Sequence, residues 1–255
     1  MKNQKISIGN VQIALSLGVG FAGGLISGVL GGILVSNRLN SARRMPYANA
    51  WERSLAQKRG HVQASCFVNQ VESRYWELFC QRPRLVSGPL RDHLNNNILP
   101  GLALYQILRE EEREMPEALA AVEKLFVQAT RAAHRPIQIM GRLPIFFRVL
   151  RARTPSVLNK SFPSDGWELE WVEISPDSVA FNMHSCFYLD ICTHYGVPEL
   201  TLVYCKLDDL LYDGISPYVR WERTGTLARG DEVCDFRWTR VLADTGAGSD
   251  LPIAE

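Results

Sequence analysis

The sequence predicts an α+β protein, in which helices pack on a small antiparallel sheet of two hairpins after an N-terminal transmembrane helix. Residues 11–36 carry no charged side chain, apolar residues recur at helical spacing between about 51 and 153, and apolar and polar residues alternate after Thr154-Pro155. These patterns divide the chain into an N-terminal tail (1–10), a transmembrane helix (11–36), a juxtamembrane helical segment (37–90), an α+β domain (91–242) and a disordered tail (243–255).

The uncharged segment 11–36 is longer than the roughly 20 residues that cross a ~30 Å hydrocarbon core. A cleaved signal peptide is the first alternative, although its apolar region is usually only ~7–15 residues long. A buried core helix is the second, but it would not explain the basic residues on both sides of the segment. We therefore expect an uncleaved anchor.

Glycines recur every fourth residue inside this segment, at Gly20, Gly24, Gly28 and Gly32. Small residues at this period produce a flat helix face on which another membrane helix can pack closely. Glycine is also common in membrane helices without such a role. The regular spacing nevertheless predicts a helix–helix partner in the membrane.

The basic residues around the segment set its expected orientation. Lys2 and Lys5 precede it, whereas Arg38, Arg43 and Arg44 follow closely. Positive-inside counting therefore places the soluble domain in the cytoplasm, on a single-pass protein of the cell inner membrane. The six cysteines show no compact disulfide spacing, which agrees with a reducing compartment.

Four helical stretches are expected after the membrane exit, where Met45-Pro46 interrupts the helix. They run from about Trp51 to Phe79, from Ile98 to Arg113, from Pro116 to about Ala129, and from Ile137 to Arg151. The last stretch carries a basic cluster of Arg142, Arg148, Arg151 and Arg153. We interpret this cluster as a solvated or membrane-facing surface, because a net charge of +1 does not indicate a nucleic-acid partner.

Two hairpins are expected after residue 154. In the first, Trp167, Leu169 and Trp171 alternate with glutamates, a Ser-Pro-Asp-Ser turn follows, and the alternation resumes through Met183. Helices are predicted from Cys186 to Tyr195 and from about Glu199 to Tyr212. The second hairpin covers Tyr218 to Val241, with its turn at Arg229-Gly230-Asp231.

No phosphate loop, dinucleotide fingerprint or serine-nucleophile elbow is present in the sequence. His184 and Cys186 lie two residues apart, so they share one face if the strand extends that far. An imidazole beside a thiol can hold the thiolate as an ion pair and so activate it as a nucleophile. The alternative is a buried structural cysteine beside a solvent-facing histidine.

The helix that follows has a polar stripe of Thr201, Cys205, Asp208 and Tyr212, which either lines a pocket or faces water. In the last strand Asp235 and Arg237 share one face, where they either pair with each other or bind a carboxylate through the guanidinium group. Cys234 falls on the opposite face with Phe236 and Trp238, as expected of a core residue. Zinc is a weaker alternative, because the cysteines and histidines lack zinc-site spacing.

Residues from about Ile98 to Trp238 resemble the L-2-amino-thiazoline-4-carboxylic acid hydrolase family. The resembling segments read ILPGLALYQIL, HSCFYLDICTHYGVPELTLVYCKLDD and RTGTLARGDEVCDFRW. The resemblance implies hydrolytic ring opening of a cyclic isothiourea to an N-carbamoyl-cysteine. It does not cover the transmembrane segment.

This chemistry needs a nucleophile or activated water, a proton donor, and a cation for the substrate carboxylate. We assign Cys186 as nucleophile, His184 as base, Asp235 as the residue that orients it, and Arg237 as the carboxylate clamp. Three further positions match the family and are assigned to substrate binding: Glu199, Cys205 and Asp208. No cofactor or metal is predicted. A membrane-anchored protein that only binds a small molecule or assembles with partners is the alternative function.

Overall fold

The computed structural model describes residues 44–85 and 87–242. The predicted transmembrane helix with its glycine row and the predicted C-terminal tail lie outside this part. Within the described part, no helix is both long and apolar enough to cross a bilayer.

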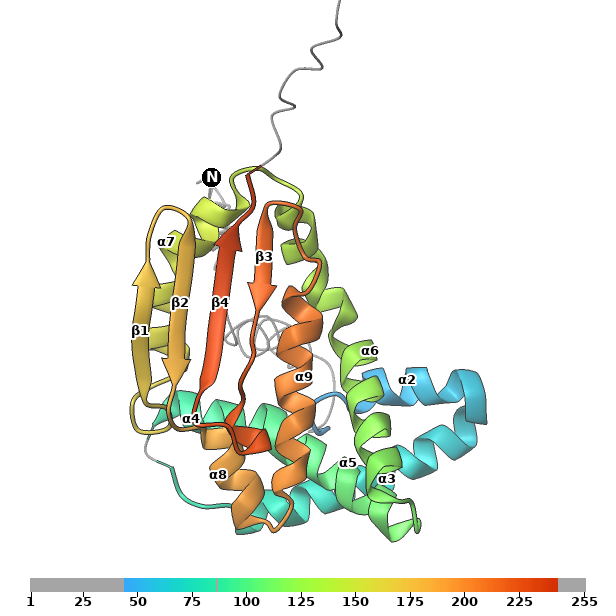
Figure 1. Cartoon of the computed structure of the whole chain (residues 1–255). Coiled ribbons are helices and arrows are strands. Elements are labelled where there is room, and N and C mark those ends of the chain that lie inside the picture. Colours follow the sequence, from blue (N-terminus) through green and yellow to red (C-terminus); the bar gives the residue numbers. More distant parts are fainter. Residues whose placement is uncertain (1–43, 86, 243–255) are drawn as a thin grey trace, which may run out of the picture.

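The described chain is an α+β fold, as predicted, with helices packed around one four-stranded sheet (Figure 1). The helices are α2 (Ala48–Arg59), α3 (His61–Gln81), α4 (Gly88–His93), the π-helix η1 (Leu94–Ile98), α5 (Leu99–Glu110), α6 (Met115–Gly141), α7 (Phe146–Ser161), α8 (Phe187–His194), the 3-10 turn η2 (Pro198–Leu200), α9 (Thr201–Tyr212) and the 3-10 turn η3 (Leu227–Arg229). The strands are β1 (Leu169–Ile174), β2 (Ser178–Met183), β3 (Val219–Glu222) and β4 (Cys234–Arg240).

The sheet confirms the prediction of two antiparallel hairpins. Its strand order is β1-β2-β4-β3, so the two hairpins join through the β2–β4 pair. Phe181 lies directly opposite Phe236 in this pair, and the two rings stack with their centroids 4.8 Å apart. The alternation of residues along a strand therefore directs both rings to the same face, against the helices.

Helix boundaries differ from the sequence prediction at two places. The single helix expected from Trp51 to Phe79 is broken at Gly60, whose φ of 78° is incompatible with an α-helix and favours glycine. The helices expected from Pro116 to about Ala129 and from Ile137 to Arg151 are also divided differently. Helix α6 continues to Gly141, and α7 begins only at Phe146 and extends past Pro155 to Ser161.

One hydrophobic core joins the helices before residue 90 to those after it. Trp51 is fully buried and packs edge-on against Phe126 of α6, with the ring centroids 5.5 Å apart. Phe126 in turn contacts Tyr204 of α9. These edge-on aromatic contacts thus connect α2 to α9, the helix that carries part of the candidate site.

Candidate functional site

A small cavity of about 70 Å³ lies between the sheet, α7, α8 and α9. We call it the thiol pocket, because Cys186, Cys205 and Cys234 all contribute to its wall. The remaining wall is mostly aromatic and apolar, with one carboxyl group and one guanidinium group: Leu158, Phe162, Trp167, Phe181, Met183, Tyr188, Thr201, Tyr204, Asp208, Arg223 and Phe236. An apolar cavity with a few converging polar groups is typical of a small-molecule site.

Helix α9 forms one side of this wall. Spacings of four and three residues on α9 bring Thr201, Cys205 and Asp208 to one side of the helix. The structure therefore places this part of the predicted polar stripe at the pocket. Tyr212, the last member of the stripe, instead packs against Trp221 and Trp238 under the sheet.

Cys186 is the N-cap residue of α8. Burial raises the pKa of its thiol well above the ordinary value, while the backbone amides of Leu189 and Tyr188 act in the opposite direction. Amide hydrogens and the positive end of a helix favour an anion at this position. Burial outweighs the amides, so the Cys186 thiol is protonated at neutral pH and needs a proton acceptor in the pocket before it can act as a nucleophile.

The other two thiols share a hydroxyl partner. The Oγ1 atom of Thr226 lies 3.3 Å from the sulfur of Cys205 and 3.5 Å from the sulfur of Cys234. The Leu227 amide donates a further hydrogen bond to Cys234. Burial raises the pKa of Cys205 to about 11, so this thiol is protonated at neutral pH.

Asp208 and Arg223 supply the charge of the pocket. The Arg223 side chain is only 4% exposed, and its Nη1 lies 3.9 Å from the Asp208 carboxylate. Its Nη2 donates to the Cys205 carbonyl and to Asp209, each at 2.7 Å. Burial raises the pKa of Asp208 to about 7; Arg223 opposes this shift and Asp209 adds to it. A carboxyl group with this pKa can accept and donate protons near neutral pH.

Tyr188 is held in the wall by a buried histidine. The Nε2 atom of His93 lies 2.9 Å from the Ser161 carbonyl, so that nitrogen carries the hydrogen and Nδ1 accepts from the Tyr188 hydroxyl at 2.9 Å. Burial lowers the pKa of His93 to about 4, which keeps the ring neutral. The Asn97 amide also donates to the Tyr188 hydroxyl. This network fixes the ring of Tyr188, which follows Cys186 by two positions in the sequence.

His184 does not share the wall of the thiol pocket with Cys186. Strand β2 ends at Met183, one residue before the histidine, so the two-residue spacing no longer places both side chains on one strand face. The His184 Nε2 atom instead pairs with Glu170 of β1 at 2.8 Å, and its side chain is 37% exposed.

Asp235 and Arg237 lie on the sheet face opposite Cys234 and Phe236, as the alternation predicts. Asp235 accepts hydrogen bonds from the Thr224 amide and hydroxyl and from the Gly225 amide, so it orders the chain after β3. Arg237 is 46% exposed and lies 3.8 Å from Glu173. Both side chains line a shallow surface depression outside the thiol pocket.

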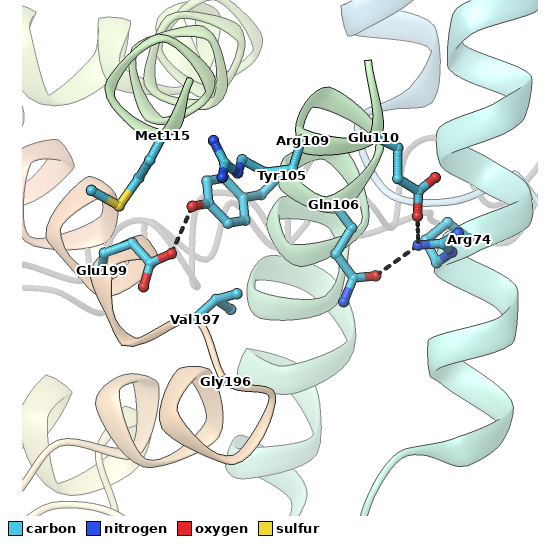
Figure 2. A pocket seen from close by; sticks show the side chains of 9 residues that line it. All are labelled: Arg74, Tyr105, Gln106, Arg109, Glu110, Met115, Gly196, Val197 and Glu199. Carbon is cyan, nitrogen blue, oxygen red and sulfur yellow. Dashed lines mark hydrogen bonds and ion pairs between the residues drawn. The ribbon is translucent and has the colours of Figure 1, made fainter. Parts of the chain in front are cut away.

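Glu199 occupies a third place, an open surface cleft between α3, α5 and the turn before η2 (Figure 2). Its carboxylate accepts a 2.6 Å hydrogen bond from Tyr105, and Figure 2 shows this pair directed toward each other across the cleft. Of the seven predicted site residues, the structure thus brings Cys186, Cys205 and Asp208 together in one pocket.

Sequence reasoning missed Arg223 as a site residue, although the resembling segment RTGTLARGDEVCDFRW starts with it. The prediction that Cys234 is a core residue is confirmed, and its buried side chain also borders the pocket. Within the described residues, no group of three or more histidine, cysteine, aspartate or glutamate side chains is arranged to hold a metal ion.

Comparison with protein families identifies a family model that covers most of the domain containing the pocket. The family model described as L-2-amino-thiazoline-4-carboxylic acid hydrolase matches residues 91–238, which is more than half of the sequence. This range contains every residue of the thiol pocket. A search among curated proteins finds no match.

Proposed function

Because the chain belongs to the L-2-amino-thiazoline-4-carboxylic acid hydrolase family, we propose that its thiol pocket hydrolyses a small cyclic isothiourea such as a 2-aminothiazoline carboxylate. The observation that carries this proposal is the convergence of Cys186, Asp208 and Arg223 on one small cavity inside the matched range. These residues supply a nucleophile, a proton acceptor and a cation, the three groups that the reaction needs.

Arg223 is the proposed partner of the substrate carboxylate, in place of Arg237. Among the described residues, all hydrogen bonds of Arg223 involve Nη2, and its Nη1 faces Asp208 at 3.9 Å. Nη1 therefore keeps hydrogens that can bind a carboxylate in the pocket. The buried position strengthens such a pair relative to one at the exposed Arg237.

In the proposed first step, Asp208 accepts the proton of the Cys186 thiol, and the thiolate attacks C2 of the ring. The C2–S bond of the ring then breaks, and the ring sulfur takes the proton from Asp208. The product of this step is an open-chain isothiourea bound through C2 to Cys186. The amides of Tyr188 and Leu189 stabilise the attacking thiolate.

In the second step, a water molecule gives a proton to Asp208 and adds to the same carbon. The bond from C2 to the Cys186 sulfur then breaks, and the sulfur recovers the proton. The released product is an N-carbamoyl-cysteine, and one water molecule is consumed for each ring opened. Cys205 stays protonated in this scheme, as its raised pKa indicates, and it shapes the wall of the pocket together with Cys234.

We further propose that residues 11–36 anchor this hydrolase in the cell inner membrane, with the soluble domain in the cytoplasm. The uncharged length of the segment and the excess of basic residues after it support the anchor and the orientation. Gly20, Gly24, Gly28 and Gly32 would provide the packing face for a second membrane helix.

The experiment that tests the catalytic proposal is the pH dependence of turnover of 2-amino-thiazoline-4-carboxylate by the full chain. Because Asp208 acts in its ionised form and has a pKa of about 7, kcat/KM should rise with pH through about 7 and then level off. Asp208→Asn should lower kcat/KM by about 10²–10⁴-fold and remove this rise.

His184→Gln is the matched control, because it removes the base that the sequence alone predicts. It should leave both the rate and the pH profile unchanged, since His184 lies outside the pocket wall. A profile that disappears with His184→Gln and persists with Asp208→Asn would reverse the two assignments. Absence of product from the wild-type chain would favour a protein that binds and does not react.

A further inference from the structure

The turn between α6 and α7 exposes large apolar side chains on a strongly basic surface. Ile139, Leu143 and Ile145 are 63%, 46% and 47% exposed. The same two helices and the turn also carry four exposed arginines: Arg135, Arg142, Arg148 and Arg153. We call these seven side chains the α6–α7 corner. At the top of Figure 1, α6 ends and the chain turns back into α7.

The charge of this region is one-sided. Residues 131–160 contain seven arginine and lysine residues and no aspartate or glutamate, although the whole chain has a net charge of only +1. Within residues 44–85 and 87–242, none of the seven arginine and lysine residues of this segment forms an ion pair. The excess positive charge therefore remains available to an anionic partner.

The turn is held in place by the core beneath it. Phe146 and Phe147 at the start of α7 are buried, and Gly141 at the end of α6 packs against the backbone carbonyl of Ile215. A side chain at position 141 would collide with that carbonyl, which explains the glycine. The exposed apolar residues therefore lie on helix ends that are packed tightly against the core.

We propose that the α6–α7 corner binds the surface of an anionic phospholipid membrane, with Ile139, Leu143 and Ile145 inserted among the head groups. Interfacial protein segments combine these two features, apolar side chains that enter the acyl boundary and arginines that bind lipid phosphates. Nucleic acid fits less well, because its phosphate backbone offers no partner for three exposed aliphatic side chains. This inference is independent of the proposed reaction and of residues 11–36.

The test is hydrogen–deuterium exchange of the full chain with lipid nanodiscs, made either of phosphatidylcholine alone or of phosphatidylcholine with phosphatidylserine. Amides of residues 138–149 should exchange more slowly with the anionic discs than with the neutral ones. Because each arginine near an anionic surface contributes about 1 kcal/mol, or about fivefold in affinity, Arg142→Gln with Arg148→Gln should remove most of this difference. Leu143→Ser with Ile145→Ser should remove it as well.

Arg220→Gln with Arg229→Gln is the control, because it removes the same charge from exposed positions outside residues 131–160. This pair should keep the lipid-dependent protection. Equal exchange in the two kinds of disc would overturn the proposal and indicate that another segment or a second copy of the chain covers the corner. Protection by a short DNA duplex that exceeds protection by anionic discs would overturn it in favour of nucleic acid.

Discussion

Cys186→Ser is expected to reduce kcat for 2-amino-thiazoline-4-carboxylate by about 10³-fold or more, which is on the order of the effect of removing a catalytic nucleophile. The serine hydroxyl retains the approximate size of the thiol but is a weaker acid and a poorer nucleophile, so Asp208 cannot readily convert it into an anion for the amides of Tyr188 and Leu189 to stabilise. Stability should change little, because serine is a favoured residue at the N-cap position that Cys186 occupies. Steady-state kinetics and urea unfolding of the same preparation measure both effects.

Cys192→Ser is the matched control on the same helix. Cys192 is 1% exposed and lies outside the pocket wall, so its replacement should lower the urea midpoint and leave kcat nearly unchanged. Full activity of Cys186→Ser would remove the thiol from the mechanism. Water activated directly by Asp208 would then become the preferred nucleophile.

Replacing Arg223 should produce the second large effect, on binding and on stability together. Arg223→Met leaves Asp208 without the cation beside it and removes the ion-pair partner of Asp209, whose side chain is 44% exposed. Breaking a buried charge pair typically costs about 3–5 kcal/mol of unfolding free energy, which is the upper limit expected here. Arg223→Lys keeps the charge but loses the planar group that bonds Asp209 and the Cys205 carbonyl at once. We therefore expect a smaller loss of stability in the lysine variant, with KM raised by about tenfold or more.

Arg237→Lys serves as the control for this experiment, because the sequence alone assigns the carboxylate clamp to Arg237. Its side chain is 46% exposed and its contact with Glu173 is long, so the variant should have wild-type KM and stability. A raised KM in Arg237→Lys together with a normal KM in Arg223→Lys would restore the original assignment.

The fold could be predicted largely from local pattern. The alternation along β2 and β4 correctly separated Phe181 and Phe236 from Asp235 and Arg237, because the side chains of a strand point to alternate faces. The break of the first long helix was missed, although Gly60 marks it in the sequence. The spacing on α9 likewise placed Cys205 and Asp208 on one side of a helix.

The composition of the site depended on contacts that no local pattern contains. Alternation assigned Asp235 to the solvent face, but its bonds to Thr224 and Gly225 depend on how the chain after β3 folds back. Arg223 follows β3 like any solvated residue, and it is buried only because α9 and Phe236 cover it. Likewise, the pairing of His184 with Glu170 depends on the register of β1 against β2.

The central claim is that Cys186 forms a covalent bond with its substrate during ring opening, and mass spectrometry of the acid-quenched protein tests it most directly. The full chain would be mixed with excess 2-amino-thiazoline-4-carboxylate, quenched within one turnover and digested. We predict an adduct with the full mass of the substrate on the peptide that contains Cys186, because ring opening expels no fragment. The adduct should be absent from Cys186→Ser. Turnover without any adduct, or an adduct on Cys205 or Cys234 with Cys186 unmodified, would contradict the proposed mechanism.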